Sequence, residues 1–276
     1  MLEESINNQV FEDNLPDWSI GRAYKSMSWF INQMSKYWML WEKSPFPKLD
    51  KITSWILRGK VYTIGASSNV GKSKFAYHWV NHFLSLWKKV VFFSLEVDSW
   101  MALLNIMINK YKIPFKEFTN MENIKDLWIG DFDNLIIYDN VYQLEQINKL
   151  VHHNNPDYVF IDFVQNIQTS WWSNYEKLAK IAISIQQMAI TSQATVFSLS
   201  QLSNSVWKDV SWWNLDFISL KWAWEFFASS DVIFVLYRLW DWELWMRIAK
   251  NKYWRAWEDI YFDVDFWLWQ FEIKKD

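Results

Sequence analysis

Cysteine is absent from the chain, and glycine is scarce. Without cysteine, the chain can form neither a disulfide nor a thiolate metal site. Its 276 residues include only 5 glycines, where average usage of about 7% would give roughly 19. The clearest apolar run, VIFVLY (232–237), is far shorter than the roughly 20 residues that span a membrane. The N-terminal MLEESINNQV has neither the basic nor the apolar region of a secretory signal, so we expect a soluble cytoplasmic protein with no membrane partner.

Tryptophan is in excess by about as much as glycine is missing, with 23 copies in the chain. Several lie where a turn is needed, such as Trp254 and Trp257 in NKYWRAWEDIYFD (251–263). Turns favour Gly, Asn, Asp and Pro over an indole. We therefore interpret most of the tryptophans as glycines, encoded by UGA in a genetic code that reads UGA as glycine. The alternative is a genuinely tryptophan-rich protein, and UGG codons at 222, 224, 254 and 257 would establish it.

Net charge bears on whether the protein binds nucleic acid, and chain length bears on the number of domains. The chain has 28 basic and 31 acidic residues, a net charge of −3, which mildly opposes nucleic-acid binding because such proteins are often basic. The apolar spacing over 22–38 predicts an amphipathic helix, and SPFPKLD (44–50) interrupts it with two prolines. We place a domain boundary there, between an N-terminal extension with a linker helix at 1–43 and one large domain at 44–276.

Strands and helices alternate through the predicted domain. Alternation of this kind predicts an α/β fold with a mainly parallel sheet flanked by helices, and the closing run of strands predicts antiparallel pairing at one edge. The predicted strands are 60–65, 89–96, 134–139, 157–163, 194–201, 231–238, 243–250, 258–265 and 270–275, and the predicted helices are 72–86, 98–110, 143–153 and 175–192.

A phosphate-binding motif lies between the first of these strands and the first helix. GASSNVGKS (65–73) has the spacing of a P-loop, except that Ala stands in the first Gly position. Backbone N–H groups of such a loop surround phosphates, its lysine reaches the β- and γ-phosphates, and its serine supplies a hydroxyl to Mg²⁺. We therefore expect ATP and Mg²⁺ as cofactors. The predicted ATP-binding residues are Ala66, Ser67, Ser68, Asn69, Val70, Gly71, Lys72 and Ser73.

Three other strands end in residues that could serve the same site. Glu96 could orient or deprotonate the attacking water, Asp162 has the Walker B position that holds Mg²⁺, and Gln201 could sense the γ-phosphate. An exposed acid, a helix-capping Asp and a polar loop residue are the simpler alternatives. Because parallel strands bind ligands at their carboxyl ends, we expect all three beside the P-loop.

Together the motifs resemble the RecA-type ATPase core, and most closely the motor domain of DnaB-type replicative helicases. The likeness covers about residues 44–273, in the family's order and spacing. YVFIDFVQNI resembles the family's Walker B motif with its downstream glutamine, here Gln165, and VFSLSQLSN resembles its sensor motif. RIAKNKYWRAWEDIYFD resembles the last motif, with Trp254 and Trp257 where the family has glycine. The family's globular N-terminal domain has no counterpart in this sequence.

The last motif departs from the family at its arginine finger. Lys252 occupies the finger position, and Arg255 is close enough to substitute. The resemblance implies a homo-hexameric ring in which one of these cations reaches a neighbour's ATP, while lysine lacks arginine's bidentate fork. Solvated basic residues on a hairpin are the simpler reading. The helix at 22–38 could pack on a neighbouring protomer or on its own domain.

The resemblance also implies two loops, 168–177 and 202–217, that face single-stranded DNA in the ring's channel. Read with glycine for tryptophan, both are Gly/Ser-rich and offer Lys177 and Lys208 to backbone phosphates. A loader or primase partner stays unnamed. Two alternatives remain, namely a RecA/RadA- or KaiC-like recombination or switch ATPase without unwinding activity, and a nucleotide-binding scaffold that has lost hydrolysis. His78 and His82 have a spacing that can bind metal, but we expect them to pack or to lie on the surface.

Overall fold

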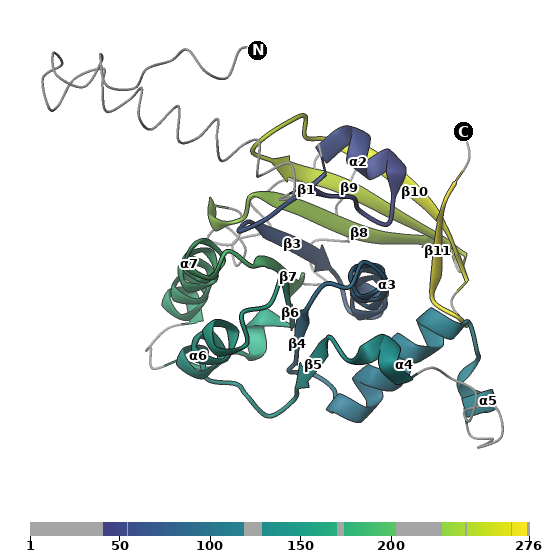
Figure 1. Ribbon diagram of the computed structural model, residues 1–276. Coiled ribbons are helices and arrows are strands. Elements are labelled where there is room, and N and C mark those ends of the chain that lie inside the picture. The colour runs from purple at the N-terminus through teal and green to yellow at the C-terminus, as the bar shows by residue number, and fades with distance from the viewer. Residues whose placement is uncertain are drawn as a thin grey trace, which may run out of the picture. The chain divides into compact units, whose positions relative to one another are not determined.

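The computed structural model describes residues 41–53, 55–118, 129–169, 174–202, 228–240, 242–265 and 267–274 (Figure 1). The chain divides into two compact units, Met1–Glu42 and Lys43–Asp276. Of the first unit, only the short strand β1 (Trp41–Glu42) is described. The predicted helix at 22–38 lies outside the described residues and stays a prediction, as does the role given to the N-terminal extension.

A nine-stranded sheet forms the centre of the second unit, in the order β11-β10-β9-β8-β3-β7-β6-β4-β5. The strands from β8 to β5 run parallel, and β9, β10 and β11 add antiparallel pairs at one edge. This arrangement confirms the predicted fold class. The strands are β3 (Val61–Ala66), β4 (Val90–Ser94), β5 (Leu135–Tyr138), β6 (Tyr158–Asp162), β7 (Thr195–Gln201), β8 (Val232–Trp240), β9 (Glu243–Asn251), β10 (Glu258–Asp265) and β11 (Gln270–Ile273), with a separate short β2 (Ile56–Leu57).

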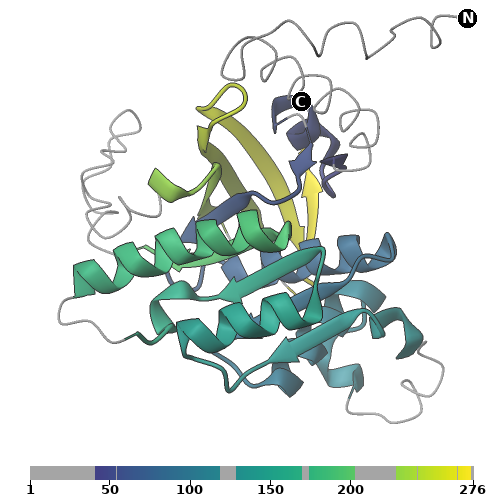
Figure 2. The ribbon, with the colours of Figure 1, turned by 60° about the vertical axis from the view of Figure 1, so that its left-hand side comes forward.

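Helices cover both faces of the parallel part. Figure 1 shows α3 and α4 on one face, and Figure 2 shows α6 and α7 side by side across the other. None of the described helices is long and apolar enough to cross a membrane. The helices are α2 (Pro47–Thr53), α3 (Lys72–Ser85), α4 (Ser99–Tyr111), α5 (Phe115–Phe118), α6 (Leu144–Asn154) and α7 (Asn174–Ser192), and the 3₁₀ turns are η2 (Ile129–Phe132) and η3 (Val164–Asn166).

The strand sequences explain why both faces are covered. Successive side chains of a strand point to opposite faces. In β6, Phe160 packs into the core under α3 and α4, while Val159 and Ile161 pack into the core under α6 and α7. Every residue of β6 is buried, as expected for a parallel strand enclosed on both sides.

The proline-rich stretch at 44–50 contains a helix as well as a break. Pro47 begins α2, at the first helical position where its missing N–H costs nothing. Phe46 and Leu49 are buried against the main core, and the Ser44 N–H donates to Asp50 Oδ1 at 2.8 Å. The stretch is therefore packed into the domain rather than forming a linker.

Tryptophans occupy several backbone conformations that side chains avoid. Among the described residues, eight non-glycine residues have positive φ, and Trp55, Trp87, Trp257 and Trp269 are four of them, at +52° to +73°. Trp254 and Trp257 are 62% and 56% exposed, as expected for indoles turned outward from the hairpin. The hairpin is nevertheless closed, because the Trp257 N–H donates to Ile248 O at 2.7 Å. The tryptophans at 222 and 224 lie outside the described residues.

Candidate active site

The predicted P-loop connects β3 to α3 at the carboxyl end of the parallel strands. Gly71 caps α3 with φ +105°, a conformation that suits glycine, and Asn69 has φ +62°. Gly71 is the N-cap of α3 and has no side chain that could cap the first turn. The N–H groups of that turn can therefore bind a ligand, and the positive end of the helix dipole favours an anion there.

Lys72 is buried at the start of α3, with only 9% of its surface exposed. Burial lowers its pKa, and the carboxylates of Asp162 and Glu96 partly oppose that shift. Its Nζ lies 4.8 Å from the centre of the Phe163 ring. A desolvated cation of this kind gains most from a concentrated anionic partner such as a triphosphate.

Asp162 ends β6 beside Lys72 and Ser73. Burial raises its pKa, whereas the Lys72 charge and a hydrogen bond with the Ser73 side chain act in the opposite direction. Asp162 Oδ1 is buried and finds no hydrogen-bond partner among the described residues. A buried carboxylate oxygen next to a hydroxyl suits a hard divalent cation such as Mg²⁺.

The rest of a magnesium shell would come from the nucleotide and water. The described part of the chain holds no group of three or more His, Cys, Asp or Glu side chains that could bind a metal. Mg²⁺ at phosphate sites uses one or two protein groups and fills its shell with phosphate oxygens and water. Ser73 and Asp162 therefore fit this role.

Glu96 lies closer to solvent than the predicted strand implied. We expected strand 89–96 to end at Glu96, but β4 ends at Ser94, and the Leu95 N–H makes the last bond to β6, donating to Asp162 O at 2.7 Å. Glu96 is exposed in the connection to α4. Its charge still raises the pKa of Lys72, so it faces the same site. An exposed carboxylate at this edge can meet water.

Gln201 ends β7 and contacts the P-loop directly. Its Nε2 donates to Ser68 Oγ at 2.6 Å. The pairing of β3 with β7 sets Ala66 beside Gln201, which explains the contact. The structure thus brings the predicted P-loop, Glu96, Asp162 and Gln201 to one edge of the sheet.

The other two predicted site residues, Lys252 and Arg255, lie at the opposite end of the sheet. Asn251 pairs with Val232, and Val232 lies beside Tyr62 at the amino end of β3. The length of β3, roughly 17 Å at about 3.3 Å per residue, therefore separates the β9–β10 turn from the P-loop. Neither cation can serve the ATP site of its own chain in this arrangement.

The two cations differ in their surroundings. Lys252 Nζ lies 3.3 Å from Asp231 Oδ1, which also accepts a 2.8 Å hydrogen bond from the Tyr253 hydroxyl. Asp231 is itself anchored, because its Oδ2 accepts from the Val61 N–H at 2.9 Å. Arg255 is exposed at the turn. Lys252 thus helps to fix the hairpin to the sheet, whereas Arg255 faces outward.

Comparison with known proteins identifies the family of this chain. The model of the DnaB-like helicase C-terminal domain matches residues 43–211. This chain belongs to that family. No curated protein sequence matches it.

Three solved structures share the fold of this DnaB-family domain. One, described as an ATPase domain, aligns with a TM-score of 0.76 and 18% identity, over 93% of this chain and 99% of that one. A DnaB-like replicative helicase studied with its interactions with primase gives 0.72 and 19%, over 93% and 67%. A KaiC-like protein from the hyperthermophilic archaeon Pyrococcus horikoshii OT3 gives 0.60 and 14%, over 85% and 99%. At these identities, the likeness establishes the fold.

The sequence analysis named Gln165 only as the glutamine downstream of the Walker B motif and did not single out Asp231, yet the structure ties both to the predicted residues. Gln165 bonds to the end of β7, and Asp231 holds Lys252. A signal existed for each: Gln165 is a polar residue within the apolar stretch FVQNI, and Asp231 immediately precedes a buried strand. A polar residue in such a position is expected to need a hydrogen-bond or ionic partner, but the sequence does not show which residue that partner is.

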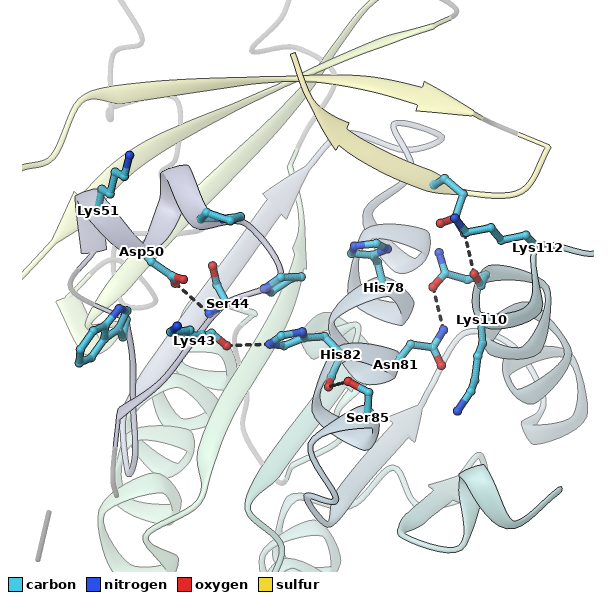
Figure 3. A pocket seen from close by; sticks show the side chains of 15 residues that line it. Lys43, Ser44, Asp50, Lys51, His78, Asn81, His82, Ser85, Lys110 and Lys112 are labelled. Carbon is cyan, nitrogen blue, oxygen red and sulfur yellow. Dashed lines mark hydrogen bonds between the residues drawn. The ribbon is translucent and has the colours of Figure 1, made fainter. Parts of the chain in front are cut away.

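A cavity of about 730 Å³ lies away from the ATP site, among α2, α3, the end of α4 and β11 (Figure 3). None of the predicted ATP-binding residues lines it. His78 stacks on Phe46 with ring centres 5.3 Å apart, and burial lowers its pKa to about 4. His82 Nε2 lies 2.7 Å from Lys43 O. Both histidines thus pack against their own domain, as expected.

Proposed function

We propose that this DnaB-family domain is the motor of a replicative DNA helicase that hydrolyses ATP to move along single-stranded DNA and separate a duplex. The observation that carries the proposal is the meeting of the P-loop, Asp162, Glu96 and Gln201 at one edge of a RecA-like sheet in a chain of this family. The proposed helicase works in the cytoplasm as a homo-hexameric ring.

Each group has a distinct part in the proposed hydrolysis. The P-loop amides and Lys72 hold the β- and γ-phosphates, and Ser73 and Asp162 hold Mg²⁺, which neutralises phosphate charge when bound. Glu96 orients the attacking water and accepts its proton. Gln201, already bonded to Ser68, responds to the γ-phosphate.

The remaining charge stabilisation comes from a neighbouring copy. Lys252 and Arg255 lie at the far end of the sheet from their own ATP site, which favours action on another subunit. We assign the finger to Arg255, because Lys252 is engaged by Asp231 of its own chain. Arginine's planar fork also suits a phosphate better than a lysine ammonium.

Single-stranded DNA is the proposed track, and a primase is a proposed partner. One structure that shares the fold is a DnaB-like replicative helicase with interactions with primase, and we extend that partner to this chain. Of the two proposed DNA-facing segments, residues 170–173 of the first and 203–217 of the second lie outside the described residues.

The test compares Glu96→Gln with the unmodified ring. We expect unmodified protein to hydrolyse ATP, to do so faster with single-stranded DNA, and to unwind a forked duplex. Glu96→Gln should bind ATP and lose turnover by at least about a hundredfold. Glu272→Gln, which changes an exposed glutamate on β11, is the matched control and should leave turnover unchanged.

The same assays separate the alternatives. A recombination or switch ATPase is the alternative that agrees with the fold match to a KaiC-like protein. Filament formation or strand exchange without unwinding would favour this alternative. An absence of hydrolysis by the unmodified protein in the presence of DNA would instead favour a nucleotide-binding scaffold.

A further inference from the structure

Gln165 joins the end of β6 to the end of β7 through both ends of its amide. It lies in η3, three residues after Asp162. Its Nε2 donates to Ser200 Oγ at 2.9 Å and to Gln201 O at 3.0 Å. Its Oε1 accepts from the Gln201 N–H at 3.3 Å. The side chain therefore fixes the backbone of the residue that touches the P-loop.

Two further hydrogen bonds link Gln201 to the P-loop and Gln165 to α7. The Gln201 side chain donates to Ser68 Oγ in the P-loop at 2.6 Å. Lys177 Nζ, in the first turn of α7, donates to Gln165 O at 3.1 Å. Lys177 ends one segment expected to face DNA, and Gln201 immediately precedes the other. Gln165 thus contacts the described ends of both segments and, through Gln201, the nucleotide loop.

We propose that Gln165 is a positioning residue that couples the nucleotide site to the DNA-facing segments, an inference that rests on the proposed function. A phosphate seated in the P-loop competes for the Ser68 hydroxyl and for the Gln201 amide. Any shift of Gln201 must move or break its two hydrogen bonds to Gln165, because hydrogen bonds weaken steeply with poor alignment. The shift then reaches the Lys177 anchor of the other segment.

The experiment measures ATP turnover with and without single-stranded DNA for the unmodified ring and for Gln165→Met, which keeps side-chain length and removes the amide. We expect basal turnover and KM for ATP to stay within about twofold. Stimulation by DNA should fall at least about fivefold, at the lower end of typical coupling strengths. A purely structural role would lower basal and stimulated turnover together.

Two more variants make the result decisive. Gln165→Glu keeps the size and the acceptor but loses the Nε2 donors, so it should also lose stimulation while disturbing packing less. Gln187→Met, an exposed glutamine on α7, should behave as the unmodified protein. Full stimulation in both Gln165 variants would overturn the coupling role alone, as would an equal loss of basal turnover. Absence of stimulation in the unmodified ring would overturn the helicase function and the coupling together.

A second inference concerns the tryptophans, and a separate observation carries it. At the end of α3, the Lys88 N–H donates to Phe83 O and the Trp87 N–H to Leu84 O. This pair of bonds is the Schellman motif, in which Trp87 occupies the position that glycine usually takes. Trp87 has φ +60° and is 79% exposed. A bulky residue with positive φ is a genuine outlier.

We infer that Trp55, Trp87, Trp257 and Trp269 are read as glycine in the source organism, whereas Trp79 is a true tryptophan. All four have positive φ. Trp79 lies inside α3, is fully buried and meets Phe75 edge-on, with ring centres 6.3 Å apart. Glycine at that position would weaken the helix and leave a large void.

The coding sequence and the mass of the native protein test this assignment. We expect UGA at codons 55, 87, 257 and 269 and UGG at codon 79. Peptides from the source organism should carry glycine at the first four positions, and each replacement should make a peptide roughly 129 Da lighter than its tryptophan form. UGG codons at the four positions, or peptides that retain tryptophan there, would overturn the inference.

Discussion

The turn after β3 and the turn between β9 and β10 have similar backbone demands but different residues. The first uses Gly71 and Asn69 at positive φ, and the second uses Trp257. The first gathers the predicted ATP-site residues of its own chain, while the second presents Arg255 at the other end of the sheet. In the proposed ring, each chain supplies most of one ATP site and a cation for another. The comparison also indicates that the fold requires positive φ, a conformation that favours glycine, at a position where the sequence has tryptophan.

The largest expected effect is at the first turn, in Lys72→Met. Hydrolysis should fall by at least about a thousandfold, because the cation that meets the phosphates is lost. The free energy of unfolding should rise, since burial lowers the pKa of Lys72 and disfavours its charge. Steady-state turnover and urea unfolding measure the two effects. Lys149→Met, at an exposed position of α6, should change neither, and a loss of stability in Lys72→Met would contradict the second effect.

The next effect belongs to the second turn. Arg255→Ala should lower turnover of the assembled ring by at least about a hundredfold, and it should leave the stability of the domain unchanged because Arg255 is exposed. Mixing Arg255→Ala subunits with Lys72→Met subunits should restore part of the turnover, since some interfaces then combine an intact P-loop with an intact Arg255. Failure of the mixture to recover would argue against action between subunits. Lys252→Met should mainly lower stability, through loss of the contact with Asp231.

A smaller effect is expected from replacing tryptophans that have positive φ with glycine. Trp87→Gly and Trp257→Gly should each raise the free energy of unfolding by about 1 kcal/mol, since positive φ costs a non-glycine residue about 1–2 kcal/mol. The thermal midpoint should rise by about 2–4 °C per substitution. Trp100→Gly, at an exposed helical position in α4, is the matched control and should give no gain. Equal changes at all three sites would show that loss of an exposed indole, rather than φ, is responsible.

Much of the parallel sheet could be predicted because its strands are short apolar runs that end in polar residues. Asp162 and Gln201 were placed correctly, since adjacent parallel strands must end at the same edge. The Gln165 attachment could not be predicted, because an amide gives no sign of which backbone groups it will meet. The different surroundings of Lys252 and Arg255 likewise could not be predicted, because they depend on Asp231. The pairing of β8 with β9, rather than the local sequence, sets Asp231 beside the turn.

The smallest effect concerns Lys74, which lies near Trp269 in the turn between β10 and β11. Its Nζ lies 5.0 Å from the centre of the Trp269 ring, and burial lowers its pKa from 10.5 to about 8. Between pH 8 and 10.5 the unfolded chain binds a proton that the folded domain does not, so this group makes stability rise with pH, by at most about 1.4 kcal/mol per pH unit. Trp269→Gly should expose Lys74, return its pKa toward 10.5 and reduce that rise. Urea unfolding at about pH 7.5, 8.5 and 9.5 measures the slope. Lys74→Met removes the titrating group and provides the reference, so an unchanged slope in Trp269→Gly would show that the indole does not desolvate Lys74.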